Sequence, residues 1–401
     1  MYICSSLRQN GYVPAILNLD LERLSFQETI DRIKAINPRY IGFSGIVSTS
    51  YGIIKRLSRD LRNILPDRKQ ILGGGLSAAW EPVLENTAID VIVRGEGDET
   101  IIELLQHLDE AKNISGIKGI AFRDGQGAVY TGRRRLFIPL DRLPYPDFDA
   151  VDFDRYLVDG LEFIHRFTKN NLDQGIYDSK RRNKRMITIP VSRGCFGKCT
   201  FCYRAYPGLR THSFKYIFDF VEYCIDRFDV GFFTFGDECF APNKKWNWGF
   251  LKELEKRKLD IVFRILGMRV DTVDQEILRA YKEAGCWMIE YGFESGSQKM
   301  LNIIDKRVSV EENRQVALWT NEVGIYTSPA LVLGMPGETS YTIGESIRFL
   351  DSLDLGFRKY QMAYAMPIPG APLYEYAKLS GIISDEDEYL EMISGKATDQ
   401  P

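Results

Sequence analysis

The sequence has few of the residues by which several protein classes are recognised. Its 401 residues include three histidines and seven cysteines, with a formal net charge of −3. An odd number of scattered cysteines does not suit a disulfide framework and favours a reducing cytosol. No run of about 18 apolar residues is present, and the first residues lack the order of a signal peptide. We therefore expect a cytoplasmic protein without a membrane span. The small net charge gives no general attraction to nucleic acid.

The length and composition predict more than one folded domain. A chain of 401 residues that is 44% hydrophobic and 27% charged exceeds one ordinary core. The pattern along the chain predicts a first domain over 1–110, a connector with a hairpin over 111–185, a second domain over 186–383 and an acidic tail over 384–401.

The first domain alternates short apolar strands with amphipathic helices, which predicts a doubly wound parallel sheet of the Rossmann type. Gly73 and Gly74 follow one expected strand and Gly95 follows the next, at the edge where such sheets bind ligands. These glycines serve either close approach to a ligand or only a tight turn. The expected strands are Val13–Leu17, Tyr40–Phe43, Gln70–Leu72 and Val91–Val93; the expected helices are Ile3–Gln9, Phe26–Ile36, Tyr51–Ile64 and Thr100–Leu108.

The second domain repeats strand and helix at intervals typical of a barrel. Six strand–helix units without a clear seventh and eighth predict an open, partial (β/α)6 barrel. The expected strands are Ile187–Val191, Gly231–Phe235, Ile261–Leu266, Met288–Gly292, Pro329–Leu333 and Lys359–Ala363. The connector before it holds a predicted hairpin of Gly119–Arg123 and Ala128–Thr131.

Three thiols gather in one short loop directly after the first barrel strand. Cys195, Cys199 and Cys202 are spaced four and then three apart. A cubane iron–sulfur cluster normally takes four thiolates, so this trio leaves one iron without a protein ligand. The alternatives are three structural cysteines or half of a zinc site, but no second cysteine pair or nearby histidine completes such a site. The spacing therefore predicts a [4Fe–4S] cluster with an open iron.

The CxxxCxxC loop, with the aromatic Phe201 before its last cysteine, resembles the motif of radical S-adenosylmethionine (SAM) enzymes. The resemblance implies that SAM chelates the open iron and that an electron from the cluster cleaves SAM to a 5′-deoxyadenosyl radical. It also implies a reductant such as flavodoxin or ferredoxin.

Further motifs of the family follow the later strands in order. Asp237 and Glu238 stand where the family holds the ammonium group of SAM, and the sequence does not choose between them. An acidic turn that caps the strand is the structural alternative. The resemblance also implies SAM contacts from Arg269, with Arg264 as a rival, from Glu294 and Ser295 of a GxES-like element, and from Glu338 of a GxPGE-like turn. Ser295 and Glu338 equally suit caps of the helices that follow.

The first domain resembles the cobalamin-binding domain that precedes one group of radical SAM enzymes. Two features depart from it. No Asp-x-His-x-x-Gly motif supplies a cobalt ligand, although that group commonly lacks it. The usual first strand is also absent, so either Met1 is not the true start or the domain is degenerate. Losing that interior strand predicts exposed strand edges. Cobalamin is therefore an expected cofactor, and a domain used only for packing or substrate contact is the alternative.

These motifs together predict a radical SAM enzyme that transfers a methyl group, with the help of cobalamin, to an unactivated carbon of a small-molecule or lipid-like metabolite. Radical cyclisation, oxidation or rearrangement without methyl transfer remains open. A tRNA methylthiotransferase fits less well, because that group has another cysteine trio in its first domain and this domain holds only Cys4. A non-catalytic iron–sulfur carrier would not need the SAM-contact motifs.

Overall fold

A computed structural model describes residues 1–168, 184–353 and 361–395. The chain divides into two compact units. The N-terminal unit comprises Met1–Ile138, Arg142–Val151 and Pro367–Pro401, and the barrel unit comprises Pro139–Asp141 and Asp152–Met366. These limits differ from the predicted boundaries, since the hairpin and the C-terminal segment both belong to the N-terminal unit. No helix among the described residues is long and apolar enough to cross a membrane.

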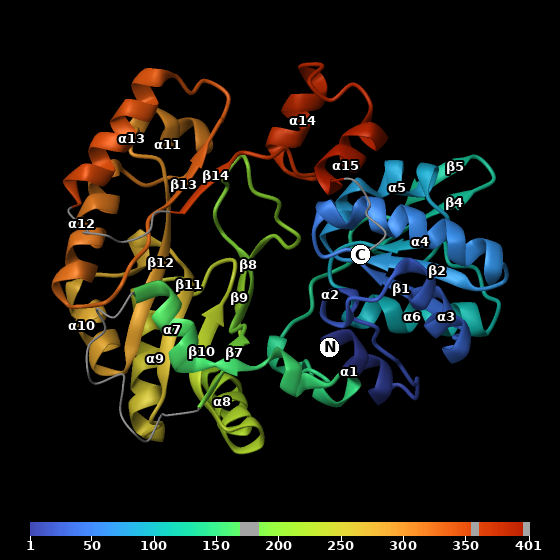
Figure 1. Ribbon diagram of the computed structural model, residues 1–401, viewed down its shortest axis with the longest axis horizontal. Helices are drawn as coiled ribbons and strands as arrows, with labels where there is room; N and C mark the ends of the chain where they lie inside the picture. The colour runs from blue at the N-terminus through green and yellow to red at the C-terminus, as the bar shows by residue number, and fades with distance from the viewer. Residues whose placement is uncertain (169–183, 354–360, 396–401) are drawn as a thin grey trace. The chain divides into compact units, whose positions relative to one another are not determined.

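The N-terminal unit is built on one five-stranded sheet in the order β1-β2-β3-β4-β5 (Figure 1). Strands β1 to β3 are parallel, and the predicted hairpin continues the sheet as the antiparallel strands β4 and β5. The strands are β1 (Tyr40–Ser44), β2 (Lys69–Gly73), β3 (Val91–Val93), β4 (Ile120–Asp124) and β5 (Gly127–Tyr130). The helices are α1 (Tyr2–Gln9), α2 (Leu19–Glu22), α3 (Phe26–Ile36), α4 (Tyr51–Ile64), α5 (Trp80–Asn86), α6 (Gly97–Asp109), α14 (Pro372–Leu379) and α15 (Glu386–Ser394).

The predicted strand Val13–Leu17 is wrong. This segment is irregular chain between α1 and α2, and the side chain of Val13 is 91% exposed. A strand needs a neighbour to satisfy its backbone groups, and no described strand lies beside this segment. Strand β1 pairs with β2 alone among the described strands, so it forms the edge of the sheet. The loss of an interior strand was expected to expose two strand edges, but β1 to β5 pair in one continuous order, and β1 is simply one end of that sheet.

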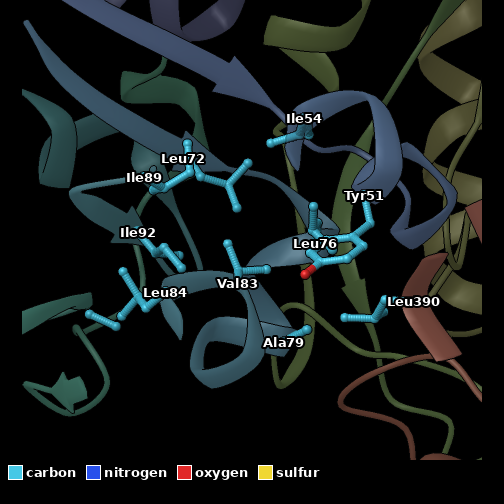
Figure 2. Close-up of a cluster of buried hydrophobic side chains, with 11 residues drawn as sticks. Tyr51, Ile54, Leu72, Leu76, Ala79, Val83, Leu84, Ile89, Ile92 and Leu390 are labelled. Carbon is cyan, nitrogen blue, oxygen red and sulfur yellow. The ribbon is translucent and has the colours of Figure 1, made fainter. Parts of the chain in front are cut away.

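The C-terminal helix α15 completes the core of the N-terminal unit. Leu390 is fully buried in the cluster that surrounds Leu72 and Ile92 of the sheet (Figure 2). The Tyr51 hydroxyl donates to the Asp387 carboxylate, and the Lys55 ammonium group lies 2.7 Å from both oxygens of that carboxylate. Part of the predicted acidic tail is thus a packed helix, because its carboxylates meet α4 while its apolar side chain enters the core.

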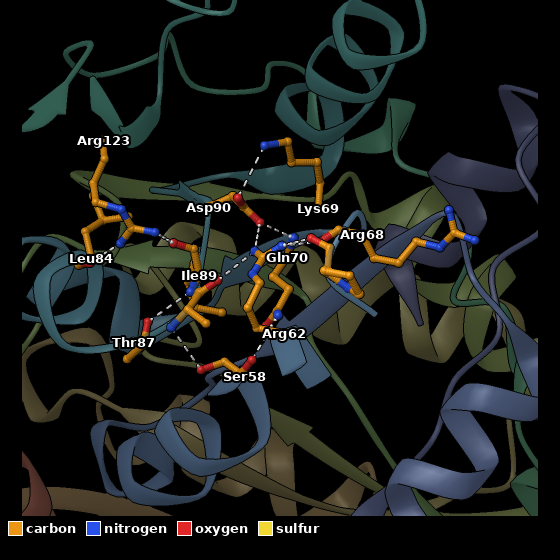
Figure 3. Close-up of polar contacts among 12 residues, drawn as sticks. Ser58, Arg62, Arg68, Lys69, Gln70, Leu84, Thr87, Ile89, Asp90 and Arg123 are labelled. Carbon is orange, nitrogen blue, oxygen red and sulfur yellow. Dashed lines mark hydrogen bonds and ion pairs between the residues drawn. The ribbon is translucent and has the colours of Figure 1, made fainter. Parts of the chain in front are cut away.

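The amino ends of β2 and β3 are joined by polar side chains (Figure 3). The Asp90 carboxylate accepts a 2.7 Å hydrogen bond from the backbone of Gln70 and pairs with Arg62. The Arg62 guanidinium also donates to the carbonyl oxygens of Pro66, Arg68 and Ala88. This end of the sheet is therefore closed by internal bonds, which leaves the carboxyl ends of the strands as the ligand edge.

The barrel unit holds a seven-stranded sheet in the order β14-β13-β12-β11-β10-β7-β6. The strands β7 and β10 to β14 are parallel, as the partial barrel predicts, and β6 is antiparallel. The strands are β6 (Val158–Asp159), β7 (Arg185–Ile189), β10 (Val230–Gly236), β11 (Val262–Met268), β12 (Cys286–Glu294), β13 (Ala330–Leu333) and β14 (Gln361–Tyr364). The helices are α7 (Gly160–Thr168), α8 (Phe214–Phe228), α9 (Lys244–Arg257), α10 (Gln275–Glu283), α11 (Gln298–Ile304), α12 (Val310–Glu322) and α13 (Ser340–Ser352).

Both faces of this sheet are covered by apolar packing. Aromatic side chains of the strands, such as Phe235 and Phe263, pack in T-shaped contacts against Phe250 of α9. On the other face, Ile164 of α7 packs against Phe232 in a second cluster. The predicted strands of the barrel lie within about two residues of the observed ones, except that residues 359 and 360 of the predicted strand Lys359–Ala363 lie outside the described residues. Apolar runs of this length and spacing suit parallel strands.

Candidate functional site

The cysteine loop is anchored at both ends in the barrel unit. Strand β8 (Ser192–Cys195) follows β7 almost directly and pairs with β9 (Gly208–Thr211). Gly194 has a φ of +86°, and a Cβ there would lie 2.3 Å from the carbonyl oxygen of Gly208, so this position requires glycine. Within the loop, the Thr200 N–H donates to the Ile304 carbonyl at 2.9 Å. The three thiols are therefore presented by a fixed backbone at the carboxyl end of the first barrel strand.

The thiols of this loop are free, and two of them face Gly197. A Cβ added at Gly197 would lie 3.2 Å from the Cys195 sulfur and 3.9 Å from the Cys199 sulfur, with the Arg269 guanidinium at 3.6 Å. The neighbouring Cys239 thiol, a hydrogen bond from the Gly197 N–H and the charges of Arg269 and Lys306 lower the pKa of Cys195 to about 6. The Cys195 thiol therefore loses its proton more easily than an ordinary cysteine, which favours a thiolate ligand.

The other two thiols differ in their electrostatics. Desolvation raises the pKa of Cys199. Cys202 is exposed, but the protein around its sulfur and the neighbouring Cys199 raise its pKa to about 11. Among the described residues, no three His, Cys, Asp or Glu side chains converge as ligands of one metal ion. A cubane differs from such a site because each thiolate binds a different iron. Three free thiols in one anchored loop therefore fit a cluster by their donor chemistry.

The two carboxylates that follow β10 have different surroundings. Asp237 accepts hydrogen bonds from the Val191 N–H at 3.0 Å and from the Ser192 N–H and hydroxyl at 2.7 and 2.8 Å. Burial nevertheless raises the pKa of Asp237 to about 7. Its oxygens tie β8 to β10. Glu238 is exposed at the surface, but the protein around its carboxyl partly removes that group from water, and this desolvation together with the nearby Cys195 raises the pKa of Glu238. Glu238 is thus the carboxylate that is available to a ligand.

Arg269 lies beside the cysteine loop. Its guanidinium binds Asp271 through two bonds of 2.9 and 2.8 Å and lies 4.9 Å from the centre of the Phe196 ring. The rival Arg264 lies elsewhere: its Nε donates to the Thr234 hydroxyl at 2.8 Å, and its guanidinium lies 4.5 Å from the centre of the Phe163 ring of α7. Arg269 is therefore the arginine that the fold brings to the thiols.

Glu294 lies at the end of β12 in an ion pair. Its carboxylate accepts from the Lys306 ammonium group at 2.7 Å, and its φ is +63°, an uncommon value for a residue other than glycine. A Cβ on Gly292 would meet both groups, so this glycine makes room for the pair. Lys306 also acts on the pKa of Cys195. The Glu294–Lys306 pair is therefore part of the same site as the cysteine loop.

The other two residues with a predicted SAM contact, Ser295 and Glu338, have hydrogen-bond partners within the protein. The Ser295 hydroxyl is buried, lies 3.1 Å from the Ser346 hydroxyl of α13 and accepts from the Ser297 N–H. The Glu338 carboxylate accepts from the Gly334 N–H and so closes the turn before α13. Neither residue is the cap of the helix that follows, because the N-cap positions of α11 and α13 are Ser297 and Thr339. The aromatic Phe201 is half-buried in the cysteine loop.

The predicted glycine turns lie at the ligand edge of the N-terminal sheet. Gly74 has a φ of +91°, and its Cβ position would lie 2.5 Å from the carbonyl oxygen of Gly45, so close backbone packing explains it. Gly73 accepts from the Gly45 N–H at 2.9 Å. Gly95 has a φ of +84° with open space around it. After β1, Ile46 and Val47 are 74% and 56% exposed. An open glycine and exposed apolar side chains at this edge fit a large, partly apolar ligand such as cobalamin.

Two residues near the thiols are absent from the predicted site. Cys239, which follows Glu238 in the same motif, lowers the pKa of Cys195, and Lys306 pairs with Glu294. Cys239 stands inside the acidic motif, and its sequence position does not indicate that it affects Cys195. Lys306 has no sequence signal, because α11 lies between it and Glu294 in the chain.

Two domain families match this chain. The Radical SAM superfamily model matches residues 189–350, and the B12 binding domain model matches residues 1–105. The chain thus carries a radical SAM domain and a B12-binding domain, which confirms the predicted family and fold class. The two matches imply the predicted cofactors, namely a [4Fe–4S] cluster, SAM and cobalamin.

Similar proteins include enzymes of more than one kind. The chain is 25% identical to an uncharacterized methyltransferase of Pyrococcus horikoshii, over 95% of this chain and 78% of the relative. It is 26% identical to an anaerobic magnesium-protoporphyrin IX monomethyl ester cyclase of Cereibacter sphaeroides, over 97% of this chain but only 61% of that enzyme.

Solved structures share the fold. The radical SAM methyltransferase TsrM of Kitasatospora setae, solved with cobalamin and a [4Fe–4S] cluster, superposes with a TM-score of 0.70 at 16% identity, covering 94% of this chain and 71% of TsrM. The cobalamin-dependent enzyme OxsB, solved with aqua-cobalamin and SAM, gives 0.69 at 18% identity, covering 98% of this chain and 53% of OxsB.

Proposed function

We propose that this protein is a cobalamin-dependent radical SAM enzyme that transfers a methyl group to an unactivated carbon of a small organic substrate. The observation that carries the proposal is the free thiol trio at the carboxyl end of the first barrel strand, beside Arg269 and the Glu294–Lys306 pair, in a chain with a B12-binding domain. A methyltransferase relative and the fold of TsrM support methyl transfer.

The chain's own residues hold and orient the reactants. Cys195, Cys199 and Cys202 would bind the cluster, and the exposed Glu238 would accept hydrogen bonds from the ammonium group of SAM. Arg269, which is bound to Asp271 by two hydrogen bonds, places its guanidinium next to the thiolates. When bound, the cofactors supply the electron that cleaves SAM and the carrier of the methyl group. A flavodoxin- or ferredoxin-like reductant is proposed as the electron donor.

Anaerobic reconstitution with iron and sulfide tests the proposal. We expect about four iron atoms per chain and, after reduction, cleavage of SAM to 5′-deoxyadenosine. The variant with alanine at all three cysteines is the control and should retain neither iron nor cleavage. A reconstituted and reduced wild-type protein that leaves SAM intact would refute the radical chemistry.

The second candidate is radical cyclisation without methyl transfer, which the cyclase relative favours. The two candidates differ in the fate of the SAM methyl group. Protein purified with cobalamin and incubated with methyl-labelled SAM should yield labelled product if methyl transfer is correct. Efficient 5′-deoxyadenosine formation with no dependence on cobalamin would favour the cyclase-like reaction.

A further inference from the structure

An arginine stands at the ligand edge of the N-terminal sheet, directly after β3. The N–H of Arg94 donates to the Gly119 carbonyl at 2.7 Å, which joins the end of β3 to the start of β4. Arg94 is two residues from Ile92, so the two side chains point to the same face of the sheet. Ile92 packs in one buried cluster with Val83 of α5. The Arg94 side chain therefore lies on the face that α5 covers, at the carboxyl end of the strands.

Two aromatic rings fix the guanidinium of Arg94. It lies 4.4 Å from the centre of the Tyr130 ring of β5 and 5.9 Å from the centre of the Trp80 ring, where α5 begins. The centres of the two rings are 6.0 Å apart, and both rings pack against the core. An aromatic face attracts the positive charge but does not replace an oxygen acceptor for the N–H groups. The rings therefore set the position of the charge and leave its donors to another group.

Carboxylates near Arg94 in the chain have other partners. Glu96 accepts from the Phe137 N–H at 2.6 Å, and Glu99 pairs with Arg134. Among the residues that the structure describes, no hydrogen bond or ion pair reaches the Arg94 guanidinium. Its side chain is half-buried, and a charge that has lost part of its water costs free energy unless an acceptor replaces that water. The guanidinium therefore suits an anionic ligand.

Cobalamin, the ligand that the B12-binding match assigns to this domain, carries such an anion. The side chains of its corrin ring are neutral amides, whereas the phosphodiester of its nucleotide is negatively charged. A guanidinium matches phosphate oxygens with two parallel hydrogen bonds. Gly95, which follows Arg94, is exposed and has open space around its Cβ position, so a group of this size can approach.

We propose that Arg94 is a cobalamin-binding residue, whose guanidinium, placed by Trp80 and Tyr130, binds the phosphate of the cobalamin nucleotide. The inference rests on the cobalamin dependence in the proposed function and not on the transfer of a methyl group. Its test measures binding, so it does not depend on an active enzyme.

Equilibrium dialysis of the full chain against two corrinoids tests the inference. One is aquacobalamin, and the other is diaquacobinamide, which has the same corrin ring but lacks the nucleotide and its phosphate. In Arg94→Ala we expect the dissociation constant of cobalamin to rise about tenfold, the effect of one lost hydrogen bond between charged groups. The dissociation constant of cobinamide should equal that of wild type, which also shows that the variant is folded.

Two more variants complete the experiment. Arg94→Met keeps a long side chain over the two rings and removes the charge, so it should show the same selective loss, and it decides the matter if the alanine variant does not fold. Arg39→Ala is the matched control. Arg39 lies 5.4 Å from the centre of the Tyr40 ring, but it stands at the amino end of β1 and pairs with Asp109 at 2.8 Å. Its affinities for both corrinoids should equal those of wild type.

Two results would overturn the inference. The first is wild-type affinity for cobalamin in folded Arg94→Ala or Arg94→Met, because the arginine would then serve only the packing of the rings. The second is an equal loss of affinity for both corrinoids in a folded variant, because the contact would then be with the corrin ring. If wild type binds cobalamin, either result leaves the proposed function standing. If wild type binds neither corrinoid, the inference and the cobalamin dependence of the proposed function both fail.

Discussion

Replacing the two carboxylates after β10 one at a time separates a ligand contact from a structural one. Glu238→Gln removes the charge of the exposed carboxylate and keeps its size. A hydrogen bond to a charged group contributes about 1.5–3 kcal/mol, and 1.36 kcal/mol equals a factor of ten. We therefore expect the dissociation constant of SAM to rise roughly 10- to 150-fold.

Asp237→Asn is the matched control for this experiment. Oδ1 of Asp237 accepts three of the hydrogen bonds from Val191 and Ser192, and an asparagine keeps one such oxygen. Its affinity for SAM should therefore stay within about threefold of wild type, a difference of about 0.6 kcal/mol.

Binding is measured anaerobically by equilibrium dialysis of labelled SAM against reconstituted protein, with iron content matched between variants. Loss of SAM binding in Asp237→Asn together with wild-type binding in Glu238→Gln would refute the reasoning from the hydrogen bonds. An equal loss in both variants would do so as well, since it would mean that the two carboxylates act as one group.

Three other perturbations have defined outcomes. Gly197→Ala places a methyl group 3.2 Å from the Cys195 sulfur, so iron uptake should fall, and uptake equal to wild type would contradict this. Leu390→Ala empties a fully buried position and should destabilise the N-terminal unit by about 2–5 kcal/mol; the midpoint of urea unfolding measures this, with exposed Leu379→Ala as the control. Burial lowers the pKa of His212 to about 4, although its Nδ1 lies 3.1 Å from Asp141. The unfolded chain therefore binds the proton more tightly, and stability should fall by about 3 kcal/mol between pH 6.5 and 4. His212→Asn should flatten this pH dependence of the unfolding midpoint, and an unchanged slope would refute it.

Several elements of this protein follow from local sequence pattern. The helices Phe26–Ile36 and Tyr51–Ile64 have the predicted bounds, because their apolar periodicity is strong and a capping box opens the first of them. The prediction of a strand over Val13–Leu17 is wrong because strand formation depends on residues far away in the chain. Its apolar residues suit a strand, but a strand exists only beside a partner, and the described sheet offers none there.

The candidate site likewise has features that follow from local sequence and features that only the tertiary structure decides. By itself the sequence determined the family, the cofactor chemistry and the thiol trio, because ligand spacing within one loop is a local property. Tertiary structure alone decided that Asp237 is bound by β8 while Glu238 is exposed, that Arg269 rather than Arg264 reaches the thiols, and that Cys239, Lys306 and the C-terminal helix have partners far away in the chain. Each of these depends on which side chains the strands and loops bring together, and hydrogen-bond and charge partners distant in sequence leave no local pattern from which to predict them.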